Sequence, residues 1–374
     1  MNVFFKNVFW LIVIFQLITL LLFYFGPIKY LTGYKSIEVF YYVIFYISLM
    51  VVGYLIPRKV VLRGKTGPSS YVKFLKISIW LTIIFVALDW YFRVGTFNIF
   101  QLSVGELYNR ANEIRVEQSS IYQYIKMFCG VFLFGLFPIY LIFFNRLSNK
   151  LKIIGGLAIS LNIFLTIAVG VNKVLFDYMI IGFLIFIQKF KISIEKIIYS
   201  FFILIFSYGV FNFFVSGQLT REGSSAISGY NYRRGTYSIY NADDNFLKIL
   251  YSQLTEYLTQ GYRVMDLSLG LNFEWTYGFG NSYFLARQVD RFFATNIEEL
   301  TYPARLHIYG IDRYIDWSTF YVWWASDLTF LGVGILTFFI GFYFRIVQNT
   351  YISNQNDIAA ILLFYYFIIL SVCK

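Results

Sequence analysis

The sequence is poor in charge and in the residues that build most metal and redox sites. Charged residues make up 14 % of its 374 positions, and it holds one histidine and two cysteines. A soluble domain is about a quarter charged, so this composition argues against one. His307 has no partners at a recognised ligand spacing, which argues against a bound metal. Cys129 and Cys373 lie in apolar stretches, so no disulfide is expected.

The sequence also lacks nucleotide-binding motifs and internal repeats. Gly278-Phe279-Gly280 is too short for a dinucleotide fingerprint, and no glycine-rich loop ends in Lys-Ser or Lys-Thr. We therefore expect no cofactor. No internal repeat of the kind that many transporters carry is found. The net charge of +11 does not indicate nucleic acid, because much of it lies in short loops between apolar segments.

What the chain has in abundance is apolar sequence. Hydrophobic residues make up 59 % of it, with a mean hydropathy of +0.63. They fall in blocks of about 20 residues, the length that a helix needs to cross a bilayer. We expect an all-α polytopic membrane protein with about nine transmembrane helices, near residues 8–25, 38–56, 77–93, 121–144, 153–171, 174–188, 197–215, 319–344 and 357–373.

Loop charge predicts the orientation. Lys and Arg concentrate in the loops after the second, fourth and sixth spans, and such loops stay in the cytoplasm. The N-terminus is therefore expected inside, and the long polar stretch outside. This divides the chain into an N-terminal bundle (1–215), a large extracytoplasmic loop (216–318) and two C-terminal spans (319–374).

The large loop is expected to be partly helical. Apolar residues recur at helical spacing from Asp244 to Gln260, with Asp243 or Asp244 as the cap and Gly261 as the end. Further helices are expected over 263–271 and 283–294. We interpret these helices as lying on the membrane surface and packing on the bundle.

Arginines are the clearest chemical feature of this loop. Guanidinium binds phosphate oxygens through two parallel hydrogen bonds. A cluster at the membrane rim therefore suits a phosphate-bearing lipid head group, although a surface or ion-pair role is the alternative for each residue. The candidates are Arg221, Arg233, Arg234, Arg287, Arg291, Arg305 and Arg313. Arg287 and Arg291 lie one helical turn apart and so share a face.

Aromatic and acidic residues complete the candidate site. Tyr and Trp faces stack on sugar rings, and Tyr232, Trp275 and Trp317 are the candidates, with an interfacial aromatic belt as the alternative. His307 could act as a general base, with a structural role as the alternative. Asp327 lies inside an apolar segment, where a charged side chain is costly and usually functional.

The end of the loop resembles a known family. The run from Trp317 through Asp327 to Gly332 is similar to the segment that re-enters the membrane in O-antigen polymerases. That family often has Asp-Phe-Gly-x-x-Gly, where this chain has Asp327-Leu-Thr-Phe-Leu-Gly332 and lacks the first glycine. Tyr257 to Arg263 resembles the family's loop helices, and Arg221 the arginine that opens the loop. The likeness covers about residues 210–345.

The resemblance implies a metal-independent glycosyltransferase in the bacterial cytoplasmic (inner) membrane. It would join polyprenyl-diphosphate-linked oligosaccharide repeat units into O-antigen or capsule on the outer face. Arginines would stabilise the leaving diphosphate. The acceptor's proton would pass to His307 or to a carboxylate, first Asp327 and then Asp312 or Asp316. The lipid bilayer, the lipid-linked glycan and a chain-length-regulating membrane protein are the expected partners.

Two alternatives stay open. A ligase of the same architecture would transfer finished glycan to another acceptor. A flippase or other transporter of lipid-linked oligosaccharide would carry charge along several spans, and few spans here do so.

Overall fold

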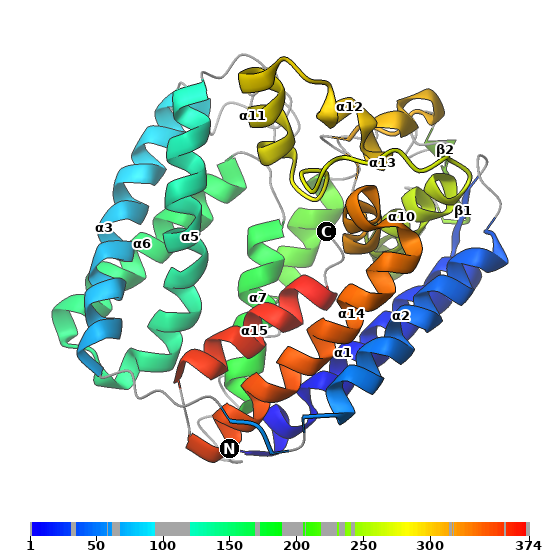
Figure 1. Ribbon diagram of the computed structural model, residues 1–374. Helices are drawn as coiled ribbons and strands as arrows, with labels where there is room; N and C mark the ends of the chain where they lie inside the picture. The colour runs from blue at the N-terminus through cyan, green and yellow to red at the C-terminus, as the bar shows by residue number, and fades with distance from the viewer. Residues whose placement is uncertain are drawn as a thin grey trace. The chain divides into compact units, whose positions relative to one another are not determined.

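The computed structural model describes most of the chain, and helices dominate it (Figure 1). The described residues are 2–30, 35–57, 59–61, 68–93, 120–168, 173–188, 205, 207–217, 230–231, 236–240, 244–313, 316, 318–354 and 357–371. They fall into two compact units, one of residues 1–4 and 63–221 and the other of residues 5–62 and 222–374. The second unit therefore joins the first two long helices to the large loop and the C-terminal helices.

The first unit is built from apolar helices. Its elements are α3 (Pro68–Arg93), α5 (Ser120–Phe143), the 3-10 helix η2 (Phe144–Arg146), α6 (Asn149–Ala168), α7 (Lys173–Gln188) and a further helical stretch at 207–217. α3 lies beside α5 and α6 (Figure 1), and the rings of Trp90 and Phe164 stack at 5.5 Å. The helices expected in this part of the chain are confirmed, except that the first half of 197–215 lies outside the described residues.

Four long helices frame the second unit. They are α1 (Asn2–Phe25), α2 (Ile37–Leu55), α14 (Phe320–Asn354) and α15 (Asp357–Ser371). α14 packs along α2 at glycines: a β-carbon on Gly341 would overlap the carbonyl oxygen of Met50, and one on Gly53 that of Phe338. Small residues of this kind let membrane helices approach backbone to backbone.

α14 is longer than the sequence predicts. It continues past the expected end at 344 to Asn354, through a polar stretch. α2 supplies partners for that stretch. Tyr54 Oη donates to Gln348 Oε1 at 2.7 Å, and Arg345 Nη1 donates to Tyr54 Oη at 2.8 Å. The helix persists because its polar side chains are hydrogen-bonded to a neighbouring helix.

A small antiparallel sheet departs from the all-helical expectation. It orders its strands β1-β3-β2, with bounds β1 (Ile28–Tyr30), β3 (Thr236–Ser238) and β2 (Tyr230–Asn231). Tyr30 pairs with Thr236, so the sheet ties the α1–α2 connection to the large loop. Strands of two or three residues are too short for an alternating pattern to show in the sequence.

The large loop folds into short helices around one long helix. The short ones are α11 (Tyr283–Phe293), α12 (Ile297–Leu300), α13 (Tyr302–Arg305) and the 3-10 helix η3 (Leu306–Tyr309), and α11 agrees with the helix expected over 283–294. The long helix α10 (Phe246–Leu269) replaces the two helices predicted on either side of Gly261.

Gly261 serves close packing within α10 instead of ending it. A β-carbon there would lie 2.9 Å from Thr319 Cγ2 and 3.1 Å from the Thr319 nitrogen. The helix begins at a different cap from the predicted Asp243 or Asp244. Asn245 is the N-cap, and its side chain accepts from the Lys248 nitrogen at 3.0 Å.

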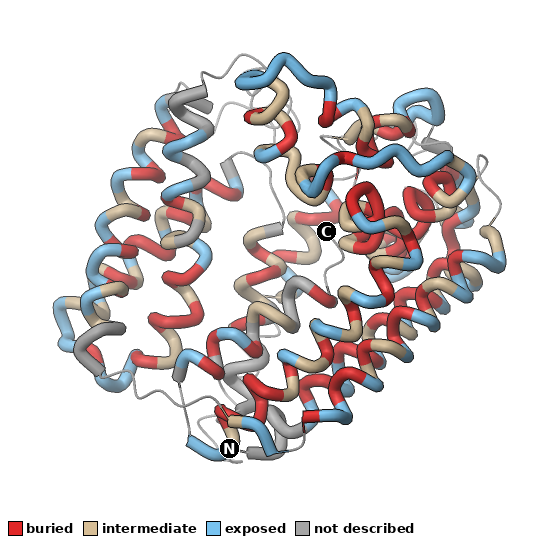
Figure 2. The backbone as a smooth tube through the Cα atoms, viewed as in Figure 1, coloured by how far each residue is buried: buried red, intermediate tan, exposed pale blue. Residues whose placement is uncertain are grey.

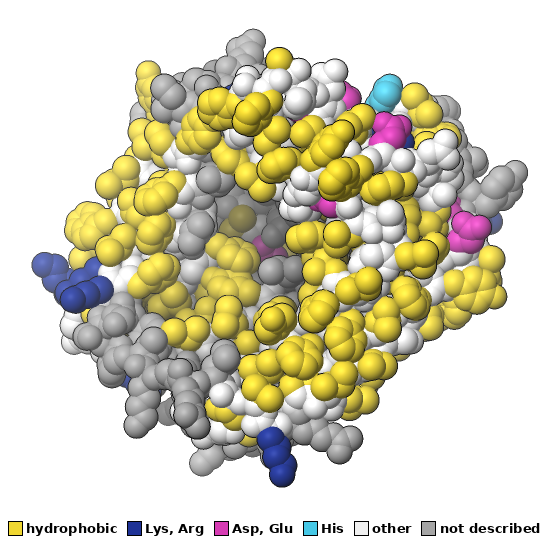
Figure 3. Space-filling view, viewed as in Figure 1, with side chains coloured by type: hydrophobic (Ala, Val, Ile, Leu, Met, Phe, Trp, Pro, Cys, Tyr) yellow, Lys and Arg dark blue, Asp and Glu magenta, His cyan; other side chains and the backbone are white. Residues whose placement is uncertain are grey.

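Five of the described helices are long and apolar enough to cross a membrane. They lie at Asn7–Phe25, Ile37–Leu55, Phe128–Arg146, Asn149–Ile167 and Phe320–Asn354. Figure 2 shows exposed positions along α1, α2 and α14, and Figure 3 shows hydrophobic side chains covering that face. Leu331, Ile335 and Tyr343 of α14 are all more than half exposed. Such a surface belongs in lipid, so the chain is a multi-pass membrane protein.

Among the described residues, three of the expected spans do not meet both conditions. α7 and α15 are 16 and 15 residues long, shorter than a perpendicular crossing needs. α3 has the length but carries Lys73, Lys76, Asp89 and Arg93.

Candidate functional site

The structure describes nine of the fourteen residues that the sequence singles out for catalysis, diphosphate binding or sugar stacking. Outside the described residues lie Arg221, Tyr232, Arg233, Arg234 and Trp317. The nine described candidates all belong to the second unit. Most of them lie on the short helices and turns between α10 and α14.

Asp327 is a hydrogen-bonding hub. Its Oδ1 accepts from Thr276 Oγ1 at 2.5 Å and from the Gly280 nitrogen at 3.0 Å. Its Oδ2 accepts from the nitrogen and the side-chain amide of Asn281, at 2.9 and 3.0 Å. The side chain is buried. Four donors occupy the carboxylate, so its geometry favours holding a turn over accepting a proton from a substrate.

The turn that Asp327 holds has an unusual backbone. Tyr277 and Gly278 have φ angles of 56° and 84°, and the Phe279 nitrogen donates to the Thr276 carbonyl at 3.0 Å. Positive φ at both central positions is the pattern of a type I′ turn. A β-carbon on Gly280 would overlap Thr276 Oγ1, so glycine is required there. The polar contacts of Asp327 fix this strained turn against α14.

Directly after Asp327, α14 is interrupted. Thr329 has φ 65° and ψ 165° inside an otherwise helical segment. Its Oγ1 accepts from the Gly332 nitrogen at 3.3 Å, and Tyr46 Oη of α2 donates to the Phe330 carbonyl at 2.8 Å. These contacts satisfy backbone groups freed by the break, as an interruption in a membrane helix requires.

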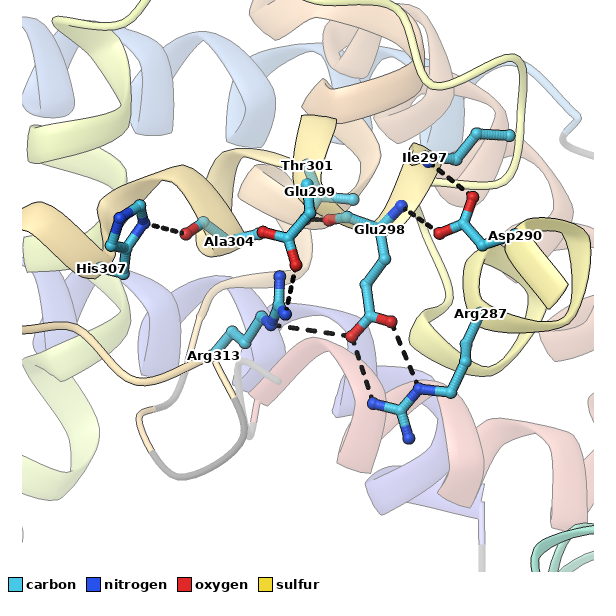
Figure 4. Close-up of polar contacts among 9 residues, drawn as sticks. All are labelled: Arg287, Asp290, Ile297, Glu298, Glu299, Thr301, Ala304, His307 and Arg313. Carbon is cyan, nitrogen blue, oxygen red and sulfur yellow. Dashed lines mark hydrogen bonds and ion pairs between the residues drawn. The ribbon is translucent and has the colours of Figure 1, made fainter. Parts of the chain in front are cut away.

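Two of the candidate arginines form an ion-pair network with glutamates (Figure 4). Arg287 Nε and Nη2 donate to Glu298 Oε2 and Oε1, at 3.2 and 3.1 Å. Arg313 lies 3.6 Å from Glu298 Oε1 through Nε and donates to Glu299 Oε1 through Nη2 at 2.6 Å. Asp290 caps α12 by accepting from the Glu298 nitrogen at 2.9 Å. The network braces α11 against the residues after η3.

Glu298 and Arg287 offer a direct test of this bracing role. Glu298→Ala is expected to lower the free energy of unfolding by about 2 kcal/mol, because it strips a partly buried partner from both arginines. A double-mutant cycle with Arg287→Ala, measured by thermal unfolding in detergent, should give a coupling of about 1 kcal/mol or more.

Arg291 provides the matched control for that cycle. It is exposed on the same helix and forms no ion pair with a residue that the structure describes. Arg291→Ala is expected to change stability by less than about 0.5 kcal/mol. Equal effects of the two arginine substitutions on stability would contradict the bracing role of Arg287.

The remaining described candidates occupy different environments. Arg305 Nη1 donates to Glu274 Oε1 at 2.7 Å, beside Trp275. Asp312 lies in a loop closed by Asp316, whose Oδ2 accepts from the Asp312 nitrogen at 2.7 Å. His307 is exposed, and its Nδ1 lies 3.0 Å from the Ala304 carbonyl oxygen. A carbonyl only accepts, so Nδ1 carries the proton and Nε2 is left as an acceptor.

The buried face of α10 is polar, a feature that the sequence reading misses. The buried positions include Ser252, Thr255, Glu256, Thr259, Gln260 and Arg263. Apolar residues of α10 lie on both sides: Leu247 and Tyr251 near its start are exposed, whereas Val264 and Met265 near its end are fully buried. Burial also raises the pKa of the Asp266 carboxyl on this helix.

The polar face of α10 packs against the small sheet. Thr236 Oγ1 donates to Glu256 Oε1 at 3.2 Å, and Tyr30 shares a hydrogen bond of 2.8 Å with Thr259. The Arg263 guanidinium lies 5.6 Å from the centre of the Tyr30 ring. Glu256 and Arg263 therefore place two buried charged side chains on one face of α10. Burying a charge is costly, and such residues often mark functional sites.

A further contact joins the polar face of α10 to Asp316, one of the candidate carboxylates. Gln260 Nε2 donates to Asp316 Oδ1 at 2.9 Å. The polar residues of α10 recur at spacings of three and four, which a reading of polar periodicity would have found. Within the described ranges, no group of three or more His, Cys, Asp and Glu gathers as a metal would need.

Comparison with known proteins finds no match to this chain among family models, curated protein sequences or solved structures.

Proposed function

We propose that this chain is a glycosyltransferase of the bacterial cytoplasmic membrane. It polymerises polyprenyl-diphosphate-linked oligosaccharide repeat units on the outer face, as O-antigen polymerases do. One structural observation carries this proposal beyond the sequence resemblance, and it is the break in α14 at Thr329.

Thr329 stands where the resembled pattern has its first glycine. In Asp-Phe-Gly-x-x-Gly the glycine follows the acidic residue by two positions, and Thr329 follows Asp327 by two. Its φ of 65° lies in the region that favours glycine. The chain thus keeps the backbone shape for which a glycine is suited, although the residue differs. The backbone conformation of Thr329 therefore supports the resemblance at a position of the pattern where the residue itself differs.

Thr329→Gly is expected to stabilise the protein by about 1 kcal/mol, because glycine adopts this conformation without the strain of a β-carbon. Thr337→Gly is the matched control, since Thr337 lies in a regular part of the same helix and should lose about 1 kcal/mol. Thermal unfolding in detergent measures both. A loss at Thr329 equal to that at Thr337 would contradict the strained break.

The proposed reaction exchanges one carbon–oxygen bond for another. The bond from C1 of the donor sugar to the diphosphate breaks, and a bond from C1 to the acceptor hydroxyl forms. The diphosphate leaves with the bonding electrons, and the hydroxyl proton passes to a base. Holding two lipid-linked sugars in alignment supplies proximity, and cations at the diphosphate stabilise the developing charge.

We assign these roles to the candidates by their environments. His307 Nε2 is suited to accept the proton, because it is an exposed acceptor with a fixed tautomer. Arg291 is exposed and suited to an anionic ligand. Asp327 acts as a positioning residue, through the turn that it holds.

Reconstitution tests the function directly. The purified full chain is placed in vesicles with its polyprenyl-diphosphate-linked repeat unit, and products are read by gel and mass spectrometry. We expect glycans of two or more repeats and release of the polyprenyl diphosphate. His307→Gln should slow elongation by about a hundredfold or more at an unchanged melting temperature. A folded wild-type chain that leaves the repeat unit unextended would overturn the proposal.

A further inference from the structure

The turn held by Asp327 displays two aromatic rings to the outside. Trp275 and Tyr277 are 56 % and 59 % exposed, while Thr276 between them is fully buried. Their ring centroids are 4.8 Å apart, with an angle of 37° between the planes. The inward residue, Thr276, anchors the turn, because its single hydroxyl proton is shared between the Ser326 carbonyl, 2.7 Å away, and Asp327 Oδ1. We name Trp275 and Tyr277 the aromatic platform.

The aromatic platform is rigid by construction. Tyr277 occupies a backbone region that disfavours side chains, and it is kept there by the hydrogen bonds from Gly280 and Asn281 to Asp327. Strain held in this way marks functional positions. A preorganised surface also loses little conformational entropy when it binds, which raises affinity.

A charged pair borders the aromatic platform. Glu274 precedes Trp275, and its Oε1 accepts from Arg305 Nη1 at 2.7 Å. The Glu274 side chain is 45 % exposed, so oxygens remain accessible at the edge of the platform. The Arg305 guanidinium lies over the Tyr302 ring at 4.9 Å, which fixes its position. The apolar faces of the aromatic platform thus lie beside a fixed hydrogen-bond donor, Arg305, and an acceptor, Glu274. This combination suits a sugar ring, which has an apolar face and hydroxyl groups at its edge.

We propose that the aromatic platform binds a sugar ring of the acceptor glycan, with Glu274 accepting hydrogen bonds from its hydroxyls. The inference rests on the proposed function for the identity of the glycan. A lipid headgroup is the competing occupant of exposed Trp and Tyr. The carboxylate of Glu274 argues against it, because anionic lipid surfaces repel negative charge, whereas a neutral sugar accepts such a neighbour.

Direct binding of a lipid-free glycan tests this site. The probe is the oligosaccharide repeat unit released from its lipid by mild acid, titrated calorimetrically into the full chain in nanodiscs. We expect Trp275→Ala to weaken binding by about tenfold. Tyr277→Gly should also weaken it while leaving the melting temperature unchanged or higher, because a φ of 56° suits glycine. This variant keeps the test valid if Trp275→Ala unfolds.

Phe293→Ala is the matched control, since Phe293 is an exposed aromatic on α11 outside the platform, and its glycan affinity should equal that of the wild type. Equal affinity of Tyr277→Gly and the wild type would overturn the proposal. The proposal would also be overturned if brominated phospholipid quenched the tryptophan fluorescence of the wild type and this quenching were lost in Trp275→Phe. Such a result would place the Trp275 ring in the bilayer. A chain that binds the oligosaccharide through the platform but extends no repeat unit refutes the polymerase and leaves the glycan site standing.

Discussion

Gly341→Ala is expected to prevent α2 and α14 from packing and to lower the free energy of unfolding by about 3 kcal/mol or more. The added β-carbon would overlap the carbonyl oxygen of Met50 and lie 2.8 Å from its carbonyl carbon. Both obstacles are backbone atoms, so no rotamer change relieves them. Gly53→Ala should behave alike, since its β-carbon would meet the carbonyl of Phe338 from the opposite helix.

The matched control for this helix crossing is Gly130→Ala. Gly130 lies within α5, and a β-carbon there meets nothing within 4 Å. That substitution should be neutral or stabilise by up to about 1 kcal/mol, because alanine is the better helix former. Thermal unfolding of the purified chain, and its yield in membranes, measure all three variants. Wild-type stability of Gly341→Ala would show that α2 and α14 do not cross at this distance.

Asp327→Ala is expected to cost about 3 kcal/mol or more, because it leaves the buried Gly280 nitrogen and the part-buried donors of Asn281 without their acceptor. Asp327→Asn should be nearly as harmful. Whichever way the new amide is turned, its NH₂ group faces a backbone N–H, that of Gly280 or that of Asn281. The 276–281 turn should then become sensitive to protease, and the melting temperature should fall.

The same variants separate a positioning role from a catalytic one. A positioning Asp327 loses stability and glycan binding together, whereas a proton acceptor would lose elongation at a normal melting temperature. Asp244→Asn is the control, since Asp244 forms an exposed ion pair with Lys248 at 3.2 Å and should change stability by less than about 0.5 kcal/mol. An Asp327→Asn protein that melts like the wild type and fails to elongate glycan would return Asp327 to the reacting centre.

The sequence predicts the elements whose causes are local. Blocks of apolar residues give α1, α2, α5 and α6 nearly at their observed bounds, and the amphipathic pattern of 283–294 gives α11. Gly261 was assigned to a helix end by the same local reasoning. That assignment is wrong because the demand for glycine comes from Thr319, which lies far along the chain.

The candidate site depends more on distant partners, which a single sequence does not reveal. Arg287 and Arg291 share a helix and differ in environment, because Glu298 faces only the first. Asp327 stood out as a charge in an apolar segment, but its partners lie near residue 280. The buried polar residues of α10 are missed because burial is equated with the apolar side of a helix, whereas their hydrogen-bond partners, Thr236, Tyr30 and Asp316, lie far along the chain.

The glycans of cells that lack this chain provide the decisive measurement. Surface and lipid-linked glycans are separated on a gel, from the deletion strain and from the same strain with the chain restored. A polymerase predicts that the length ladder collapses to a single repeat and returns with the wild-type chain. Long lipid-linked polymer would indicate a ligase instead, and an unchanged ladder would contradict glycan polymerisation altogether.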